Sequence, residues 1–475
     1  MTKKSFFLFL CLLTGSYCGQ QYLWGQTIGN YITIKGYLKN PQSELVSIDI
    51  TTNVLTGETQ SYASRLQPDG AFLILCPLAQ PTPAMFYHAD QYVPVFLFPN
   101  DSLSIQADRS DFKQSLKFEG RGAERNNFLA DYNRKYHNPT AQNEQINRMK
   151  SLNGGDFAFF AGKQKTEKQN MLNSYFKSPP EIQFYNYIED LVTIEWAGDL
   201  FDYPTVNSLQ NHKPNADLPP GYYAFADDLR FRNNHILTIA GTSELFKKLI
   251  SYKMRKITTQ AGYDQNGYYS DRHRLASQYL DNKPLYAFQA QNIIDALTYS
   301  KPELIADKYA EFIENCPYAE LSDFLKTVYN KAALLSAGNS APDFVLPNLA
   351  GDSVALRNLR GKVLYLDFWA TWCGPCRAEM SYSQTLQQLL KDKDIEFIYI
   401  SFDTDPRVWS QFIEEKQLAG THLLALSLDS QIAKDYNIKG LPRYMIIDKN
   451  GIIRDNNAKR PGEKNIASDL LKWTE

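Results

Sequence analysis

The sequence has no block of one charge sign and, beyond its N-terminus, no long apolar run. Lysine and arginine number 50 against 52 aspartates and glutamates, which gives a net charge of −2 over 475 residues. A chain without a basic excess lacks the electrostatic footprint of nucleic-acid-binding proteins. A membrane-spanning helix needs about 20 consecutive apolar residues. We therefore expect neither a nucleic-acid partner nor a transmembrane helix.

Cysteine and histidine are both scarce, with six residues of each. A zinc site takes four ligands, usually from two cysteine pairs or from one cysteine pair and two closely spaced histidines. The chain has one closely spaced cysteine pair, Cys373 and Cys376, and no two neighbouring histidines. We therefore expect no metal site and no bound cofactor.

The N-terminus has the pattern of an export signal. Lys3 and Lys4 precede an apolar run over residues 6–13, and small or polar residues follow over 14–20. This pattern predicts a signal peptide over residues 1–25 and export to the periplasm or cell envelope. Membrane contact would then require a lipid anchor on Cys18, for which the bulky Tyr17 beside it is unfavourable.

Removal of the signal would leave four cysteines if Cys18 is lost together with Cys11. Cys76 lies in an apolar run and Cys316 in a helical pattern, so we expect both to be small, buried side chains. A bridge between them also fits an oxidising compartment, but the sequence does not fix their separation.

The remaining chain changes its hydrophobic period twice, which predicts three domains. Residues 26–119 carry short runs of period two between turn clusters, which is typical of an antiparallel β-sandwich. Residues 120–336 carry apolar residues at three- and four-residue spacing, which predicts an all-α region. Residues 337–475 alternate strand and helix, and their order predicts an α/β thioredoxin-like fold. The clearest expected helices cover residues 181–196, 243–257, 285–299 and 302–315.

The cysteine pair lies where a buried strand gives way to a helix. The apolar run over residues 362–369 is a predicted strand, and Pro375 suits the first turn of the helix that follows. Two cysteines three residues apart across a first helical turn can close a disulfide. The positive end of the helix dipole favours the thiolate of the first one. The spacing therefore predicts a reversible dithiol centre.

Several separated motifs in this third of the chain carry a resemblance to a known family. They are Ala341-Pro-Asp-Phe344, Leu359-Arg-Gly-Lys362, the run from Asp367 to Glu379 that contains Trp372-Cys-Gly-Pro-Cys376, and Gly440-Leu-Pro442. With them the segment resembles the extracytoplasmic thioredoxin-like disulfide reductases of the TlpA/ResA type. The β-rich N-terminal part is similar, more loosely, to domains of unknown function that precede such modules in Bacteroidetes proteins.

The resemblance implies roles for individual residues. Cys373 would be the exposed nucleophile and Cys376 the more buried resolving thiol, and the two would form the redox-active disulfide. Trp372, Gly374 and Pro375 would support this pair. Leu441 and Pro442 match the loop with a cis proline that pairs with the backbone of a substrate.

Two acidic residues near the cysteines have competing interpretations. Asp367 interrupts an apolar strand, where burial should raise its pKa. It would take the proton of Cys376 during resolution, or it would be a structural carboxylate. Glu379 matches an acidic position that the family links to thiol protonation, but a glutamate in a first helical turn also suits the helix dipole.

These residues predict an exported thiol-disulfide oxidoreductase that reduces protein disulfides. Its partners would be exported proteins that contain disulfides and a membrane electron donor that reduces the dithiol again. A redox-sensing or binding protein whose thioredoxin module acts as a lock is the alternative. A peroxidase is a weaker one, because peroxide-reducing families have a single cysteine, in Thr-x-x-Cys, where this chain has two.

Overall fold

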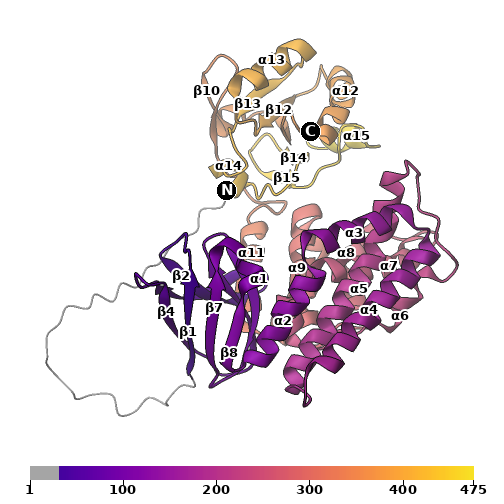
Figure 1. Cartoon of the computed structure of the whole chain (residues 1–475). Helices are drawn as coiled ribbons and strands as arrows, with labels where there is room; N and C mark the ends of the chain where they lie inside the picture. Colours follow the sequence, from indigo (N-terminus) through magenta and orange to yellow (C-terminus); the bar gives the residue numbers. More distant parts are fainter. Residues whose placement is uncertain (1–30, 475) are drawn as a thin grey trace, which may run out of the picture. The chain divides into compact units, whose positions relative to one another are not determined.

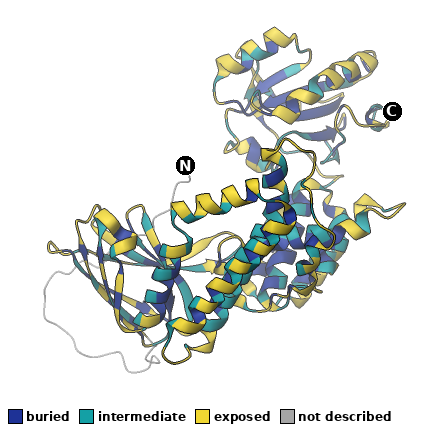
Figure 2. Cartoon of the chain, turned by 45° about the vertical axis from the view of Figure 1, so that its right-hand side comes forward, coloured by how far each residue is buried: buried dark blue, intermediate teal, exposed yellow. Residues whose placement is uncertain are grey.

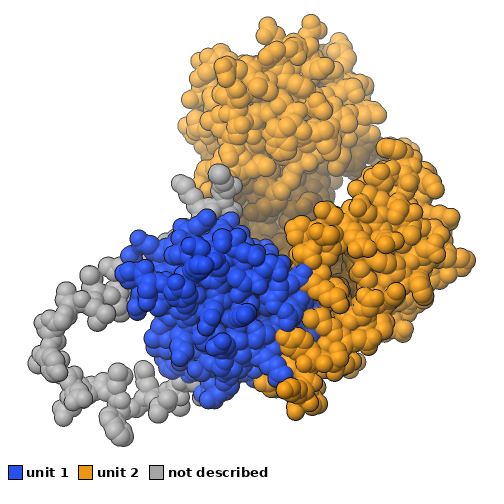
Figure 3. Space-filling view, in the orientation of Figure 1, with its two compact units in different colours: residues 1–49, 61–134 blue, residues 50–60, 135–475 orange. Residues whose placement is uncertain are grey.

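The structure is a computed structural model that describes residues 31–474. The predicted signal peptide, with Cys11 and Cys18, lies outside these residues. The chain divides into two compact units, residues 1–49 with 61–134, and residues 50–60 with 135–475 (Figure 3). Because the helical and thioredoxin-like regions fall into one unit, this division does not test the three predicted domains.

The N-terminal strands form two four-stranded sheets (Figure 1). Side chains alternate along them: in β4, Phe72, Ile74 and Cys76 are buried while Leu73 and Leu75 are exposed. The sheet orders are β4-β1-β7-β8 and β3-β2-β5-β6. The strands are β1 (Tyr31–Lys39), β2 (Leu45–Asn53), β3 (Glu58–Arg65), β4 (Ala71–Pro77), β5 (Thr82–His88), β6 (Gln91–Leu97), β7 (Ser102–Asp108) and β8 (Lys117–Arg121).

The sandwich is not wholly antiparallel, contrary to the sequence prediction. The ring of Phe72 stacks on that of Phe86 from the other sheet, with centroids 5.8 Å apart, as expected for packed sheets. However, β1 and β7 run parallel, with Ile34 opposite Leu103. The chain leaves the first sheet after β4 and re-enters it with β7, and this crossover brings β7 back in the direction of β1.

The central region is helical, as predicted, and the four expected helices correspond to α5, α7, α9 and α10. Its first residues, 123–134, belong to the first unit. The helices are α2 (Ala123–Tyr136), α3 (Pro139–Ser151), α4 (Gly154–Tyr175), α5 (Ile182–Gln210), α6 (Phe225–Asp228), α7 (Thr242–Thr258), α8 (Tyr268–Ala276), α9 (Asn282–Tyr299), α10 (Ala306–Asn315) and α11 (Ala319–Ala333), and α1 (Phe112–Ser115) precedes them between β7 and β8.

The C-terminal region is a five-stranded sheet of order β13-β12-β11-β14-β15 with helices on both faces. Strands β11, β12 and β13 are parallel, and β14 and β15 are antiparallel to their neighbours. The predicted hairpin of β9 and β10 precedes them. The elements are β9 (Val345–Pro347), β10 (Ser353–Ala355), β11 (Val363–Trp369), α12 (Gly374–Leu389), β12 (Ile395–Ser401), α13 (Pro406–Lys416), β13 (Thr421–Leu424), α14 (Gln431–Asp435), β14 (Arg443–Ile447), β15 (Ile453–Asp455) and α15 (Ile466–Leu471).

Strand β11 lies at the centre of this sheet and is buried at all seven residues. The strands of this C-terminal sheet are largely dark blue, the colour of buried residues, in Figure 2. Its alternate side chains enter two different cores. Leu364, Leu366 and Phe368 join a core with residues of α14. The side chains of Tyr365 and Trp369 join a second core with residues of α12, α13 and α15. The position of Asp367 in this alternation assigns its side chain to the α12 face.

The two remaining cysteines are not disulfide-bonded. Cys76 is buried inside the sandwich, as predicted, and its burial raises the pKa of the thiol to about 11. Cys316 is only half-buried at the end of α10. Neither residue has the depressed thiol pKa that marks a reactive cysteine.

Candidate active site

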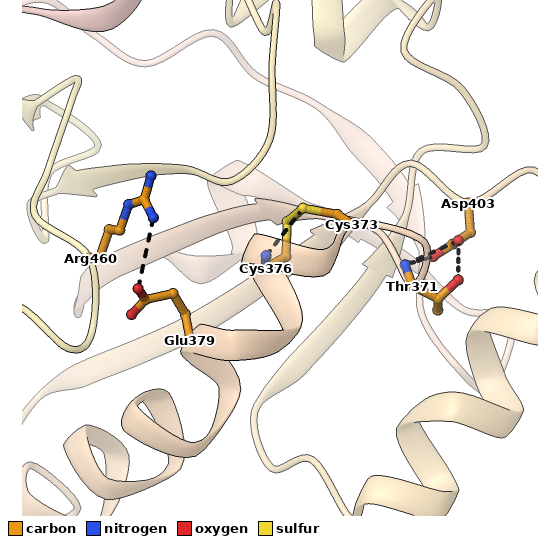
Figure 4. The surroundings of a disulfide bond; sticks show 6 residues. All are labelled: Thr371, Cys373, Cys376, Glu379, Asp403 and Arg460. Atoms are coloured by element: carbon orange, nitrogen blue, oxygen red, sulfur yellow. Dashed lines mark hydrogen bonds and ion pairs between the residues drawn. A yellow bond between two sulfur atoms is a disulfide. The ribbon is translucent and has the colours of Figure 1, made fainter. Parts of the chain in front are cut away.

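Cys373 and Cys376 form a disulfide at the N-terminal end of α12 (Figure 4). Their sulfurs are 2.00 Å apart and their Cα atoms 5.3 Å. Cys373 is the N-cap residue of α12, and its Sγ accepts a hydrogen bond of 3.2 Å from the backbone N–H of Cys376. Pro375 lies in the first turn, where its missing N–H costs no helical hydrogen bond. The sulfur of Cys373 thus lies beside the positive end of the helix dipole.

The exposure of the two cysteines differs less than the family resemblance implied. Cys373 is 5% exposed and Cys376 is 3% exposed, so the description of Cys373 as exposed is wrong for this disulfide form. Both side chains pack into the core on the α12 face, against which Leu441 also packs. The neighbouring Trp372 is 61% exposed, and Gly374 and Pro375 are exposed as well.

A buried carboxylate holds the turn that carries the cysteines. Asp403 accepts hydrogen bonds from the backbone N–H of Thr371 at 3.0 Å and from its hydroxyl at 2.6 Å (Figure 4). The hydroxyl of Ser401 donates a third one at 2.6 Å. Asp403 therefore ties the residue two positions before Cys373 to the end of β12. Asp403 was not among the residues predicted from the sequence, although polar side chains directly after a buried parallel strand are a recognisable signal.

The loop before β14 carries a cis peptide, between Leu441 and Pro442. The next residue, Arg443, pairs with Phe368 near the end of β11. This register brings the loop to the same edge of the sheet as the cysteine turn, and Leu441 packs against both cores. The structure thus brings together the two segments that the sequence separated by more than 60 residues.

Asp367 lies within β11, opposite Tyr399 on one side and Tyr444 on the other. Its Oδ1 has no hydrogen-bond partner in the described part of the chain. Loss of water raises the pKa of Asp367 well above its usual value, and the nearby charge of Glu379 raises it further. The carboxyl group is therefore protonated over a wider pH range than that of an ordinary aspartate.

Glu379 is held by the loop before α15 and is not a solvated surface residue. Its side chain is 15% exposed, and its Oε2 accepts a 3.1 Å hydrogen bond from the backbone N–H of Gly462. The guanidinium of Arg460 lies 3.9 Å from Oε1. Glu379 thus connects α12 to the 460–462 loop on the same face as Asp367.

Within residues 31–474, no group of three or more histidine, cysteine or acidic side chains is arranged to hold a metal ion. The same residues contain no helix long and apolar enough to cross a membrane.

Comparisons with known proteins agree with this geometry. Residues 336–471 match the Redoxin family. The thiol-disulfide oxidoreductase ResA of Geobacillus kaustophilus is 32% identical over 126 residues, which are 26% of this chain and 71% of that protein. The chain belongs to the ResA-type thiol-disulfide oxidoreductases.

Two further proteins extend the comparison of this ResA-type domain. ResA of Bacillus anthracis is 33% identical over 140 residues, which cover 30% of this chain and 80% of that protein. A solved structure of a thiol-disulfide oxidoreductase from Bacteroides fragilis is 28% identical and covers 28% of this chain and 98% of its own, with a TM-score of 0.25. Membership of the ResA-type proteins therefore rests on the C-terminal third of the chain.

Proposed function

We propose that the protein is an exported reductase of protein disulfides that works through Cys373 and Cys376. The observation that carries the proposal is the pair of sulfurs at the N-terminus of α12, on the same sheet edge as the cis Leu441-Pro442 loop. Helix-terminal cysteines have thiolates stabilised by unpaired N–H groups. An extended client chain beside the loop would present its disulfide to the first sulfur.

The proposed reaction is a two-electron exchange. The thiolate of Cys373 attacks one sulfur of the client disulfide, that bond breaks, and the other client sulfur leaves as a thiolate. Cys376 then loses its proton, attacks the sulfur of Cys373 and releases the second client thiol. The client gains two electrons and the enzyme is left as the disulfide. We assign the proton of Cys376 to Asp367 in its ionised form, because a carboxylate whose pKa is raised by burial is a stronger base than an ordinary aspartate.

The direction of electron flow is inferred from the two residues between the cysteines. Gly374 and Pro375 offer no side-chain donor to the Cys373 thiolate, so the reduced form receives no extra stabilisation. Proteins of this fold range from about −270 to about −120 mV, a difference of roughly 7 kcal/mol for two electrons. We place this protein at the reducing end. A reducing role outside the cytoplasm requires a membrane donor that supplies two electrons per turnover.

The decisive experiment traps the intermediate. In Cys376→Ser, resolution is blocked, so a covalent adduct through Cys373 should accumulate in cell envelopes and disappear on treatment with a thiol reductant. Cys373→Ser is the matched control, since it retains one thiol but lacks the attacking one. Equal adduct formation in both variants, or none in either, would contradict the proposal.

A further inference from the structure

A cavity of about 550 Å³ opens beside the cis-proline loop. One wall is the segment from Asn437 to Tyr444, and a second comprises residues 457–460 with Glu463. Thr298 and Tyr299, the last two residues of α9 in the helical region, complete the lining. The cavity therefore belongs partly to the thioredoxin-like domain and partly to the region that precedes it in the sequence.

Three polar contacts attach the C-terminal end of α9 to the thioredoxin-like domain. Arg443 donates to the backbone carbonyl of Thr298, and the Asn457 side chain donates to that of Tyr299 at 3.0 Å. Lys301 forms an ion pair with Asp455 at 2.7 Å. The last carbonyl groups of a helix have no hydrogen-bond partner within the helix and form the negative end of its dipole. The guanidinium of Arg443 and the side-chain amide of Asn457 satisfy two of these carbonyl groups. The contacts leave the Tyr299 side chain 62% exposed beside the cavity.

The cavity lining carries more positive than negative charge. Its charged residues are Lys439, Arg443, Lys459, Arg460 and Glu463. Two of the cations are engaged, because Arg443 is bound to Thr298 and the Lys459 ammonium pairs at 2.7 Å with Asp469, which lies outside the lining.

The other two cations are available to a ligand. Lys439 is exposed and has no ion pair among the described residues. Arg460 forms a long ion pair of 3.9 Å with Glu379, but its side chain remains 48% exposed. The single acidic side chain, Glu463, accepts a 3.0 Å hydrogen bond from the backbone N–H of Arg460. The cavity thus offers two cations to an anionic group.

The rim of the cavity has an unpaired stretch of backbone. In the part of the chain that the structure describes, the N–H and C=O groups of Gly440 and Leu441 make no hydrogen bond. Free backbone N–H and C=O groups in such a loop can form main-chain hydrogen bonds with an extended client chain. Because successive side chains of an extended chain point to opposite sides, a client paired here would direct one side chain near its disulfide into the cavity.

We propose that this cavity is a specificity subsite for an acidic side chain of the client, formed jointly by the thioredoxin-like domain and the end of α9. The substrate class is disulfide-containing polypeptides with aspartate or glutamate within a few residues of the attacked cysteine. Lys439 and Arg460 bind the carboxylate, and Tyr299 forms the wall beside it. This inference rests on the proposed reductase function and names its preferred clients.

The test uses the pre-reduced full-length protein and three synthetic peptides that differ only in the residues flanking one cysteine of an internal disulfide. These residues are glutamate, glutamine or lysine. The second-order rate constant of reduction is measured in single turnovers and divided by the rate constant with dithiothreitol, which removes intrinsic differences between the peptides. We expect the glutamate peptide to react about five- to tenfold faster than the glutamine peptide, with the advantage decreasing as salt is added.

Two variants and one control variant test which residues carry the effect. Lys439→Glu should remove the glutamate preference, whereas Lys434→Glu, an equal charge change at an exposed residue of α14 outside the lining, should retain most of it. Tyr299→Ser should lower the preference at least about twofold without loss of folding, because the ring is mostly exposed.

The outcomes separate this inference from the function on which it rests. If none of the three peptides is reduced, the reductase proposal fails. If all three react at the same normalised rate, the reductase stands and the acidic subsite is refuted. An unchanged preference in Lys439→Glu also refutes the subsite. An unchanged preference in Tyr299→Ser would refute the contribution of α9.

Discussion

Asp403 determines how firmly the cysteine turn is held, although it touches neither sulfur. Its carboxylate satisfies the backbone N–H and the hydroxyl of Thr371, and it is itself buried with Ser401. Loss of one partner of a buried hydrogen bond costs about 1–3 kcal/mol, because the other partner stays buried without water.

We therefore expect Asp403→Ala to lower the free energy of unfolding by about 2 kcal/mol. The variant should also shift the reduction potential of the Cys373–Cys376 couple, because the turn that carries Cys373 loses its anchor. Urea unfolding and equilibration in a dithiothreitol buffer measure the two effects. Asp429→Ala, at an exposed position, is the control. A destabilised variant with an unchanged potential would show that Asp403 is purely structural.

Asp367 gives a second prediction at this scale, with opposite effects on stability and rate. A carboxyl whose pKa is raised by folding binds more protons in the folded state, so stability falls as pH rises from about 4 toward the folded pKa. Asp367→Asn removes this penalty, and the variant should be more stable than the wild type at pH 7.

The same variant should resolve the mixed disulfide roughly 100-fold more slowly at neutral pH, because the proton acceptor is gone. Stopped-flow measurement of the second step between pH 5 and 9 tests this expectation. A more stable variant with an unchanged rate and pH profile would support the structural interpretation of Asp367.

At the scale of elements, helix α5 carries two half-buried acidic residues, Glu195 and Asp199, that the proposed mechanism does not use. Burial alone would raise the pKa of Glu195, but hydrogen bonds and charge from His137 and Lys168 lower it to about 2. Burial raises the pKa of Asp199 to about 7, although Lys168 opposes the change and Gln145 donates to its carboxylate at 2.8 Å. Adjacent turns of one helix thus carry two carboxylates, one with a lowered pKa and one with a raised pKa.

The raised pKa of Asp199 predicts a pH-dependent helical region. Because the folded state binds the extra proton, its contribution to stability is present below about pH 4 and is lost as the pH rises to about 7. The loss amounts to about 4 kcal/mol for a shift of this size. Asp199→Asn should flatten this part of the urea-unfolding profile, measured by circular dichroism. Asp228→Asn, an exposed aspartate at the end of α6, should leave it unchanged.

For the whole molecule, the thioredoxin-like domain is expected to fold without the rest of the chain. Its two hydrophobic cores contain only residues between 335 and 473, and Leu335 belongs to the core on the α14 face. A truncated chain that starts before Leu335 should therefore reduce insulin within about twofold of the full-length rate. Its preference for acidic peptides should be at least about twofold lower, as in Tyr299→Ser, because α9 is absent while Lys439 and Arg460 remain. If only the full chain reduces insulin, the preceding regions are part of the catalytic machinery.

Much of the site was predictable because its signals are local. The cysteines follow a buried strand within a few residues and begin the next helix. Cys373, Cys376 and Pro375 could therefore be assigned to the start of a helix from their spacing alone. The loop of Leu441 and Pro442 needed the family resemblance, since a lone proline indicates only a turn. Asp403 went unnoticed because its partner Thr371 lies on a different strand-to-helix connection, and only the parallel pairing of β11 and β12 brings them together.

The sequence by itself determined the order of structural classes, the dithiol and the burial of Asp367, since period, spacing and an acidic residue in an apolar strand are properties of neighbouring residues. Only the tertiary structure decided that β1 and β7 run parallel, that Cys373 is buried in the disulfide, and that Glu379 is bound by Gly462. It also decided that α9 meets Arg443 beside the cis proline. These features depend on contacts between segments far apart in the chain, which no local pattern encodes.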